Sequence, residues 1–282
     1  MFTMMKASDT LYSIGLMAKS LVKIAAYSRK TNLQRPADAC GNSIIVLGNG
    51  PSLADTIREH GALLAGSTCM AVNFAANAPE FARLKPRYYI MADPHFFHRT
   101  DDANVKKLYA SLAAIDWKMT LIVPNGYRAT ATAMIANPAI SICYFNFNGL
   151  EGPHFFENFC YRRKLGMPRP RNVLIPALMC AIWLGYTDIK IAGADHSWLR
   201  SIWVNENNEV VSVQPHFYKE DKKEESRVRS EYTNYRLHQI LYSFYVAFKS
   251  YFGVRRFADR HNVRITNITP GSYIDAFERG SL

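Results

Sequence analysis

Short apolar runs alternate with helical segments from residue 43 to residue 195, and this alternation is the strongest constraint on the fold. The predicted helices are Ser52–Leu64, Ala103–Ile115 and Val173–Leu184. Parallel strands that are buried on both faces are almost continuously apolar, and helices between them form right-handed crossovers. We therefore predict an α/β fold with a Rossmann-like, mostly parallel sheet. Its expected strands are Ser43–Leu47, Cys69–Phe74, Arg87–Ala92, Met119–Val123, Ser141–Phe145, Asp188–Ala192 and Asn262–Ile268.

The remaining segments are assigned around this sheet. Residues 1–35 are expected as a basic, amphipathic N-terminal helix, and residues 43–282 as one domain. Within that domain, residues 146–171 combine aromatic, glycine and basic residues, which is typical of an irregular loop or lid. Residues 199–230 include a strongly charged stretch and are expected to complete this helical lid.

Composition limits the classes of protein that the chain can belong to. Of its 282 residues, 49% are hydrophobic and 20% are charged, as in a folded globular protein. The five cysteines are odd in number and none pair as CxxC, which favours a reduced, cytoplasmic protein. The net charge of +11 suits an anionic substrate, a membrane surface or nucleic acid. Nucleic acid ranks last, because no arginine-rich tract, zinc-finger spacing or RRM motif is present.

The N-terminal segment combines basic and apolar residues. No apolar run approaches the roughly 20 residues that span a bilayer. Between Met1 and Arg35, six basic residues are accompanied by a single acid, Asp9, and an apolar series recurs at helical spacing. Such a helix either packs on the main domain or anchors the protein at a membrane surface, and both interpretations stay open. The apolar series is Leu11, Ile14, Ala18, Leu21, Val22 and Ala25.

Small and polar residues gather where the predicted strands end. In parallel sheets, ligands bind beyond the carboxyl ends of the strands. Here those ends carry Gly48–Ser52, Asn73, Asp93–His95 and Gly193–His196. We expect them to form one binding site.

The segment Gly48–Ser52 follows a strand and opens a helix, as phosphate-binding turns do. Glycines let the backbone approach a ligand, and Asn49 and Ser52 add hydrogen-bonding side chains. The third glycine of the dinucleotide fingerprint is absent, because Leu53 occupies its position, and no P-loop Lys-Ser/Thr follows. An ordinary tight turn between strand and helix is the alternative.

The other strand-end residues each have a structural alternative. Asn73 offers an amide to a base or ribose, or is a satisfied core asparagine. Asp93 and Asp195 contact a ligand or begin a helix as N-caps. No His, Cys or Asp set has metal-ligand spacing, so we predict neither a metal nor another cofactor.

His216 is the leading candidate for a general base. A histidine near its reference pKa of about 6.5 accepts a proton at neutral pH, and the neighbouring Phe217 and Tyr218 would shield it from water. A lone histidine is more often structural. The competing candidates are His95, His98, His154 and His196.

Three stretches resemble one superfamily of enzymes. IIVLGNGPSLAD at Ile44–Asp55 resembles the opening of the bacterial sialyltransferases of glycosyltransferase family 42. It is also similar to the Maf glycosyltransferases and to the hydroxymethylpterin diphosphokinase-like proteins. Met179–Trp198 (MCAIWLGYTDIKIAGADHSW) and Val263–Phe277 (VRITNITPGSYIDAF) match later family segments in the same order. The resemblance implies a GT-A-like nucleotide-binding domain and sugar transfer from a CMP-linked nonulosonic acid without a metal.

The resemblance also implies roles for particular residues. Asn49, Gly50 and Ser52, with Gly48 beside them, would hold the donor phosphate and ribose. His216 would remove the acceptor proton, with Tyr218 assisting the leaving phosphate. The other implied residues are Asn73 and Asp93 at the nucleotide and Gly193 and Asp195 at the cytidine and ribose. We also expect Arg171 and His196 at the acceptor or phosphate.

The chain departs from the family pattern at three places. Asp93 replaces a second asparagine, and the tyrosine expected after Asp195 is missing, with Ser197 or Trp198 near its place. Asn172–Val173 replaces a Ser/Thr pair. These departures affect the sialic-acid interpretation more than the glycosyltransferase one.

We therefore expect a metal-independent glycosyltransferase of surface polysaccharide or glycoconjugate synthesis. Its expected partners are a CMP-sugar donor and a glycan or glycolipid acceptor. We expect no nucleic-acid partner, and the formation of a homo-oligomer stays open. The expected location is cytoplasmic, at the inner membrane face, with peripheral contact through residues 1–30. The alternatives are a pterin-type diphosphokinase and a non-catalytic, nucleotide-binding assembly module.

Overall fold

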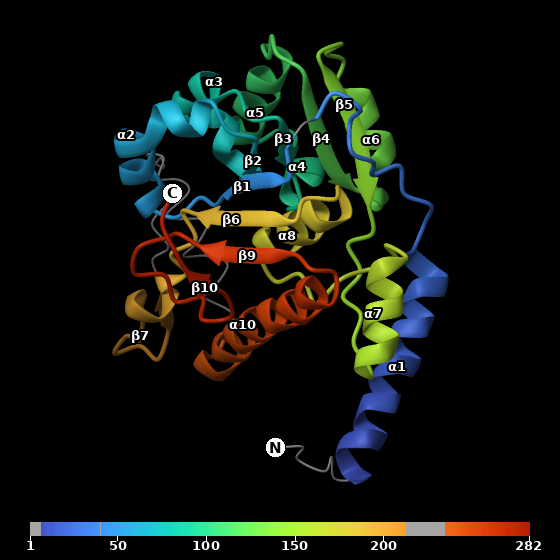
Figure 1. Ribbon diagram of the computed structural model, residues 1–282. Coiled ribbons are helices and arrows are strands. Elements are labelled where there is room, and N and C mark those ends of the chain that lie inside the picture. Colours follow the sequence, from blue (N-terminus) through green and yellow to red (C-terminus); the bar gives the residue numbers. More distant parts are fainter. Residues whose placement is uncertain (1–6, 40, 213–234) are drawn as a thin grey trace.

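One parallel sheet organises the computed structural model, which describes residues 7–39, 41–212 and 235–282 (Figure 1). Within these residues the sheet has eight strands in the order β10-β9-β6-β1-β2-β3-β4-β5, and every neighbouring pair is parallel. The predicted fold class is thereby confirmed. The strands are β1 (Ser43–Leu47), β2 (Cys69–Val72), β3 (Tyr88–Ile90), β4 (Met119–Pro124), β5 (Ile140–Phe145), β6 (Asp188–Ala192), β9 (Arg264–Asn267) and β10 (Glu278–Arg279).

The direction in which the chain adds strands reverses once. From β1 to β5 each new strand is added on one side of β1, and the chain then returns to place β6 on the other side. The strands β9 and β10 extend that second side. The boundary between β1 and β6 is therefore the topological switch point, where such sheets form a crevice at the carboxyl ends of their strands.

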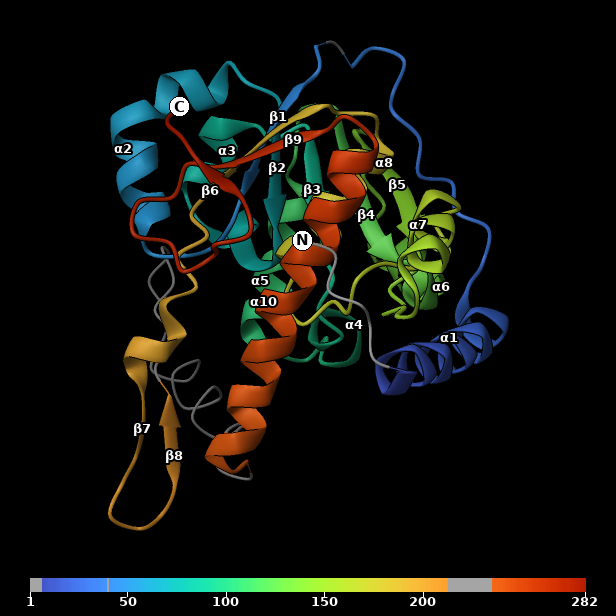
Figure 2. The same ribbon diagram turned by 60° about the horizontal axis from the view of Figure 1, so that its bottom comes forward.

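Helices cover both faces of the sheet because side chains alternate along each strand. In β1, Ile44 and Val46 face one core cluster and Ile45 and Leu47 face another. The first cluster contains residues of α7, α8 and α10, and the opposite face contains residues of α2, α3, α5 and α6 (Figure 2). Their bounds are α2 (Ser52–Ala65), α3 (Glu80–Leu84), α5 (Ala103–Ala113), α6 (Arg128–Met134), α7 (His154–Arg162), α8 (Leu174–Trp183) and α10 (Leu237–Arg260).

An N-terminal helix, a hairpin and several short helices complete the described part of the chain. The remaining elements are α1 (Ala7–Tyr27), α4 (His95–His98), a two-stranded hairpin of β7 (Ile202–Val204) and β8 (Val210–Ser212), and three 3₁₀ helices, η1 (Asn73–Asn77), η2 (Asn125–Tyr127) and η3 (Ser197–Ser201).

The segment 146–171 differs from the expected irregular loop. It contains α7, and it buries Leu150, Cys160, Tyr161 and Met167 in the core cluster shared with α8 and α10. Aromatic and basic residues here obscured a helix whose apolar face packs inward. Of the second expected lid segment, residues 199–212 contain the end of η3 and the β7–β8 hairpin, and residues 213–230 lie outside the described residues.

The helix α1 packs on the main domain, but not through the apolar series identified in the sequence. Met17 and Ile24 contact the core, and Ser20 is buried. Leu11 and Val22 lie on the opposite face, with 71% and 69% of their surface exposed. No helix among the described residues is long and apolar enough to cross a membrane.

Candidate functional site

The loops that follow β1 and β6 meet at the switch point. Leu47 pairs with Ala192 at the ends of the two strands. Beyond them, the Gly48 amide donates to the Ala192 carbonyl at 2.8 Å, and the Gly50 amide donates to the Gly193 carbonyl at 2.8 Å. These bonds continue the parallel ladder into the loops and bring residues about 145 positions apart into contact.

The glycines in these loops are required by this close approach. A Cβ atom at Gly50 would lie 2.7 Å from the Gly193 carbonyl oxygen and 2.8 Å from Cγ of Asp195. Gly193 itself has φ of +66°, a region that favours glycine. The glycine pattern therefore reflects packing between two loops of the protein as well as any approach of a ligand.

The Asp195 carboxylate occupies the start of α2. The Ser52 hydroxyl donates to its Oδ2 at 2.8 Å and the Ser52 amide donates to its Oδ1 at 3.3 Å. A carboxylate at a helix N-terminus is stabilised by the exposed amides and the helix dipole. Asp195 therefore takes the position that a phosphate would otherwise occupy at this helix. The backbone amides of Gly48, Gly50 and Ser52 all have partners within the protein.

Asn73 follows β2 in a left-handed conformation with φ of +46°. Asparagine tolerates this conformation better than most residues. Its Oδ1 accepts from the Ala92 amide at 3.4 Å, and its carbonyl accepts from the Tyr89 hydroxyl. Nearby, Nδ2 of Asn49 donates to the Val72 carbonyl at 3.3 Å. These bonds hold both asparagines at the carboxyl end of the sheet.

One cavity of about 220 Å³ lies over these loops. A larger hollow of about 380 Å³ borders Arg255, Asp259 and Arg264 at the amino end of β9, the wrong end of a parallel sheet for ligand binding. We therefore assign the candidate site to the smaller cavity. It is lined by the predicted residues Asn49, Gly50, Asn73, Gly193, Asp195 and His196, together with Pro51, Asn172, Val173, Leu174, Ser197 and Trp198.

Four other predicted residues are not among the lining residues. Gly48 and Ser52 lie directly behind the cavity and support Gly193 and Asp195. Asp93 accepts a hydrogen bond from the His95 amide at 2.9 Å, which places its carboxylate at the start of α4. Arg171 is exposed and precedes the lining residue Asn172.

A buried polar chain joins two walls of the cavity. The Tyr251 hydroxyl donates to Oδ1 of Asn172 at 3.0 Å and lies 2.6 Å from Nε2 of His196. Because the hydroxyl has one proton, Nε2 of His196 must be the donor to Tyr251. Oδ1 of Asn172 also accepts the Leu174 and Ile175 amides, which caps α8. The Nδ2 atom of Asn172 is buried without a hydrogen-bond partner among the described residues.

His196 is held as a neutral group. Burial lowers its pKa to about 3, and its ring packs 4.1 Å from the Trp198 ring. A histidine with so low a pKa stays unprotonated near neutral pH and is a poor carrier of positive charge toward a phosphate. Its contacts fit a wall of the cavity that orients Tyr251 and Asn172.

Sequence reasoning missed Tyr251. It lies within the apolar spacing of α10, and that spacing predicts a core residue. Only the packing of α10 on α8 brings Tyr251 to Asn172. His216 and Tyr218 lie outside the described residues, so their roles stay predictions. Among the described residues no three His, Cys, Asp or Glu side chains lie together in a way that could hold a metal ion.

No protein-family model matches the chain, and no curated protein matches it. Among solved structures it is similar to the MAf glycosyltransferase from Magnetospirillum magneticum AMB-1, with a TM-score of 0.51 and 14% sequence identity. The likeness covers 95% of this chain and 38% of that one, so the chain spans well under half of that protein. At this identity the comparison shows a shared, glycosyltransferase-like fold.

Proposed function

We propose that this protein is a metal-independent glycosyltransferase that uses a nucleotide-activated sugar. One observation carries the proposal. Four segments far apart in the chain place asparagine, aspartate and glycine residues around one cavity at the switch point of the sheet. The fold that does so is similar to that of a named glycosyltransferase over 95% of the chain.

We infer that the donor is of the CMP-nonulosonic acid type and that the acceptor is a glycan or glycolipid. Asp195 and Asn73 would bind ribose or base hydroxyl and amide groups, since both line the cavity and carry hydrogen-bonding side chains. The unpartnered Nδ2 of Asn172 would donate to an acceptor atom of the donor. His216 would remove the acceptor proton as the phosphate leaves, a contribution of roughly 10²–10⁴-fold in such reactions.

A thermal-shift panel of CMP-, UDP-, GDP- and ADP-sugars in EDTA tests this proposal. A ligand that binds only the native state stabilises it, by about 2.7 kcal/mol at a concentration 100 times Kd. We expect a CMP-sugar to raise the melting temperature without metal. Asp195→Asn should reduce the shift, because the amide cannot replace both carboxylate acceptors. Asp101→Asn is the matched control, since Asp101 makes only an exposed pair with Arg99. The site assignment is contradicted if none of the nucleotide sugars raises the melting temperature. It is also contradicted if the two variants show equal shifts.

Two other functions are separated by simple measurements. A pterin-type diphosphokinase would require Mg²⁺ and ATP, so its activity would disappear in EDTA. A non-catalytic module would bind the nucleotide sugar without hydrolysing it in the absence of acceptor. We further propose that the protein acts at the cytoplasmic face of a membrane, with residues 1–30 in peripheral contact.

A further inference from the structure

The helix α1 has one face that the protein covers and one that it does not. Figure 1 shows α1 beside α7 at the edge of the molecule, extending away from the sheet. The covered face carries Met17, Ser20 and Ile24. The uncovered face carries the apolar series Leu11, Ile14, Ala18, Leu21, Val22 and Ala25, all exposed, which we name the α1 stripe.

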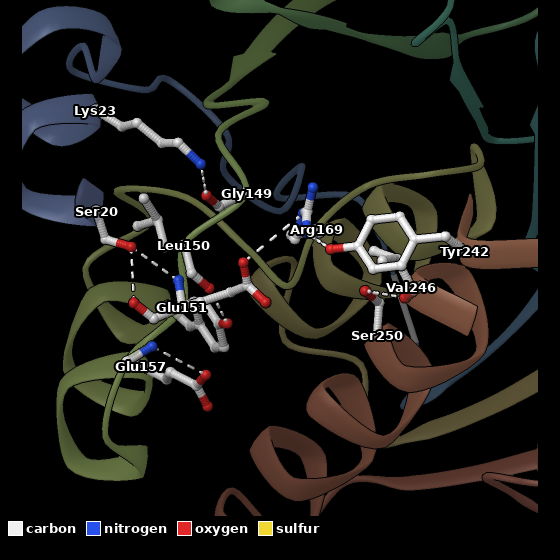
Figure 3. A network of polar contacts seen from close by, with 12 residues as sticks. Ser20, Lys23, Gly149, Leu150, Glu151, Glu157, Arg169, Tyr242, Val246 and Ser250 are labelled. Carbon is white, nitrogen blue, oxygen red and sulfur yellow. Dashed lines mark hydrogen bonds and ion pairs between the residues drawn. The ribbon is translucent and has the colours of Figure 1, made fainter. Parts of the chain in front are cut away.

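Polar contacts fix the orientation of α1. The Ser20 hydroxyl donates to the Glu151 carbonyl at 2.8 Å and accepts from the Glu151 amide at 2.9 Å. Lys23 donates to the Gly149 carbonyl at 2.9 Å, as Figure 3 shows. Further along, Ser28 donates to the Leu165 carbonyl at 2.6 Å. Because these bonds all lie on the covered side, α1 cannot rotate to bury the stripe without breaking them.

The stripe is long and continuous. At 3.6 residues per turn its members span an arc of about 100° and a length of about 21 Å. Leu11, Leu21 and Val22 are 71%, 51% and 69% exposed. Monomeric proteins rarely leave a contiguous apolar face of this kind in water, so it indicates a contact with something outside the chain.

The charges around the stripe identify its partner. Lys19 is exposed beside the stripe, and Arg29 and Lys30 are exposed just beyond the helix. The only acid in α1 is Asp9, which lies on the opposite side of the helix by its spacing. With a net charge of +11, the protein as a whole is attracted to anionic surfaces.

We infer that the α1 stripe inserts into the interface of an anionic lipid bilayer, with α1 lying parallel to the membrane plane. An apolar face with basic residues beside it and at its end, here Lys19, Arg29 and Lys30, is the pattern of interfacial helices. A second copy of this chain is a poorer partner, because its stripe has the same basic border and no facing acid. The inference deepens the membrane contact proposed above, and it does not depend on sugar transfer, since lipid binding needs no nucleotide.

Vesicle co-sedimentation of the full chain tests this inference. The probes are phosphatidylcholine vesicles with or without about 30% phosphatidylglycerol. We expect binding to the anionic vesicles, weakened when ionic strength rises from about 0.05 to about 0.5 M. Leu11→Ser should lower the partition coefficient by about tenfold, the effect of losing one buried leucine side chain. Leu63→Ser, at a 48%-exposed position on α2, is the matched control and should bind like the unsubstituted protein.

Other outcomes overturn the inference. Equal vesicle binding by Leu11→Ser and Leu63→Ser would exclude the α1 stripe as the membrane-binding surface. Absence of vesicle binding, together with a dimer in analytical ultracentrifugation that Leu11→Ser dissociates, would assign the stripe to a second copy. If Leu11→Ser does not fold, an environment-sensitive dye on Val22→Cys provides the second readout. It should become more fluorescent with anionic vesicles, whereas the same dye on Leu63→Cys should not. A failed nucleotide shift leaves these results unaffected, so the two proposals fail separately.

Discussion

At the scale of single residues, the glycines of the site have a packing role that their spacing does not suggest. The pattern Gly48-x-Gly50 resembles a phosphate-binding turn, yet the backbone amides of both glycines bond to carbonyls of the β6 loop. Asp195 then supplies the negative charge at the start of α2. If the proposed function is correct, the donor phosphate binds elsewhere in the cavity. The glycines position the carboxylate of Asp195, which borders that cavity.

Gly50→Ala should destabilise the protein by about 1–3 kcal/mol, because its Cβ would press on Gly193 and Asp195 in a packed loop. Gly126→Ala is the matched control, since a Cβ there meets nothing within 4 Å and should change stability by less than about 0.5 kcal/mol. Urea unfolding of the two variants measures the difference. Equal free energies of unfolding would mean that the two loops do not pack as described.

His196 predicts a pH dependence of stability. Its pKa is lowered by burial to about 3 in the folded state, so the unfolded chain binds a proton that the folded chain does not. Its contribution to stability is therefore complete above about pH 6.5 and decreases as pH falls toward 3, by up to about 1.4 kcal/mol per pH unit.

His196→Asn removes that titration, and asparagine tolerates the left-handed φ of +50° at this position. Unfolding free energies measured from pH 7 to pH 4.5 should fall less steeply in the variant than in the unsubstituted protein. His98→Asn is the matched control, because His98 is exposed. Identical slopes for the His196 variant and the unsubstituted protein would show that His196 protonates without unfolding.

At the scale of elements, α1 is held by a few polar contacts in addition to the packing of Met17 and Ile24 on the core. Ser20→Ala should cost about 1–3 kcal/mol, because it leaves the amide and carbonyl of Glu151 without their partner. Thr10→Ala, at an exposed position of the same helix, should change stability by less than about 0.5 kcal/mol. Thermal unfolding compares the two. A neutral Ser20→Ala would indicate that water readily replaces the hydroxyl and that α1 is held less firmly.

An element could be predicted from the sequence where both of its faces are buried. The strand Ser43–Leu47 is apolar on both faces, and the structure places it at these bounds. Helix α7 was missed because its exposed Phe155 and Phe159 and its basic residues mask its inward face. The apolar periodicity of α1 correctly indicated a helix. In an ordinary surface helix the apolar face packs on the domain, whereas in α1 the apolar series is exposed.

At the scale of the whole molecule, the order of strands creates the site. Loops near residues 48–52 and 193–198 meet only because the chain returns after β5 to place β6 beside β1. Asn172 and Tyr251 join them because α8 and α10 pack together on one face of the sheet. The cavity is therefore a product of the order in which the strands are placed in the sheet.

The sequence alone determined the fold class, most strand positions and six residues of the cavity, since buried strands and their polar ends leave a local pattern. The tertiary structure decided which charges and hydrogen bonds these residues have. Whether Asp195 faces a ligand or Ser52, and whether His196 is neutral, depend on burial and on neighbours up to 143 residues away. The exposure of the α1 stripe was decided in the same way, because periodicity defines a face but only packing determines what covers it.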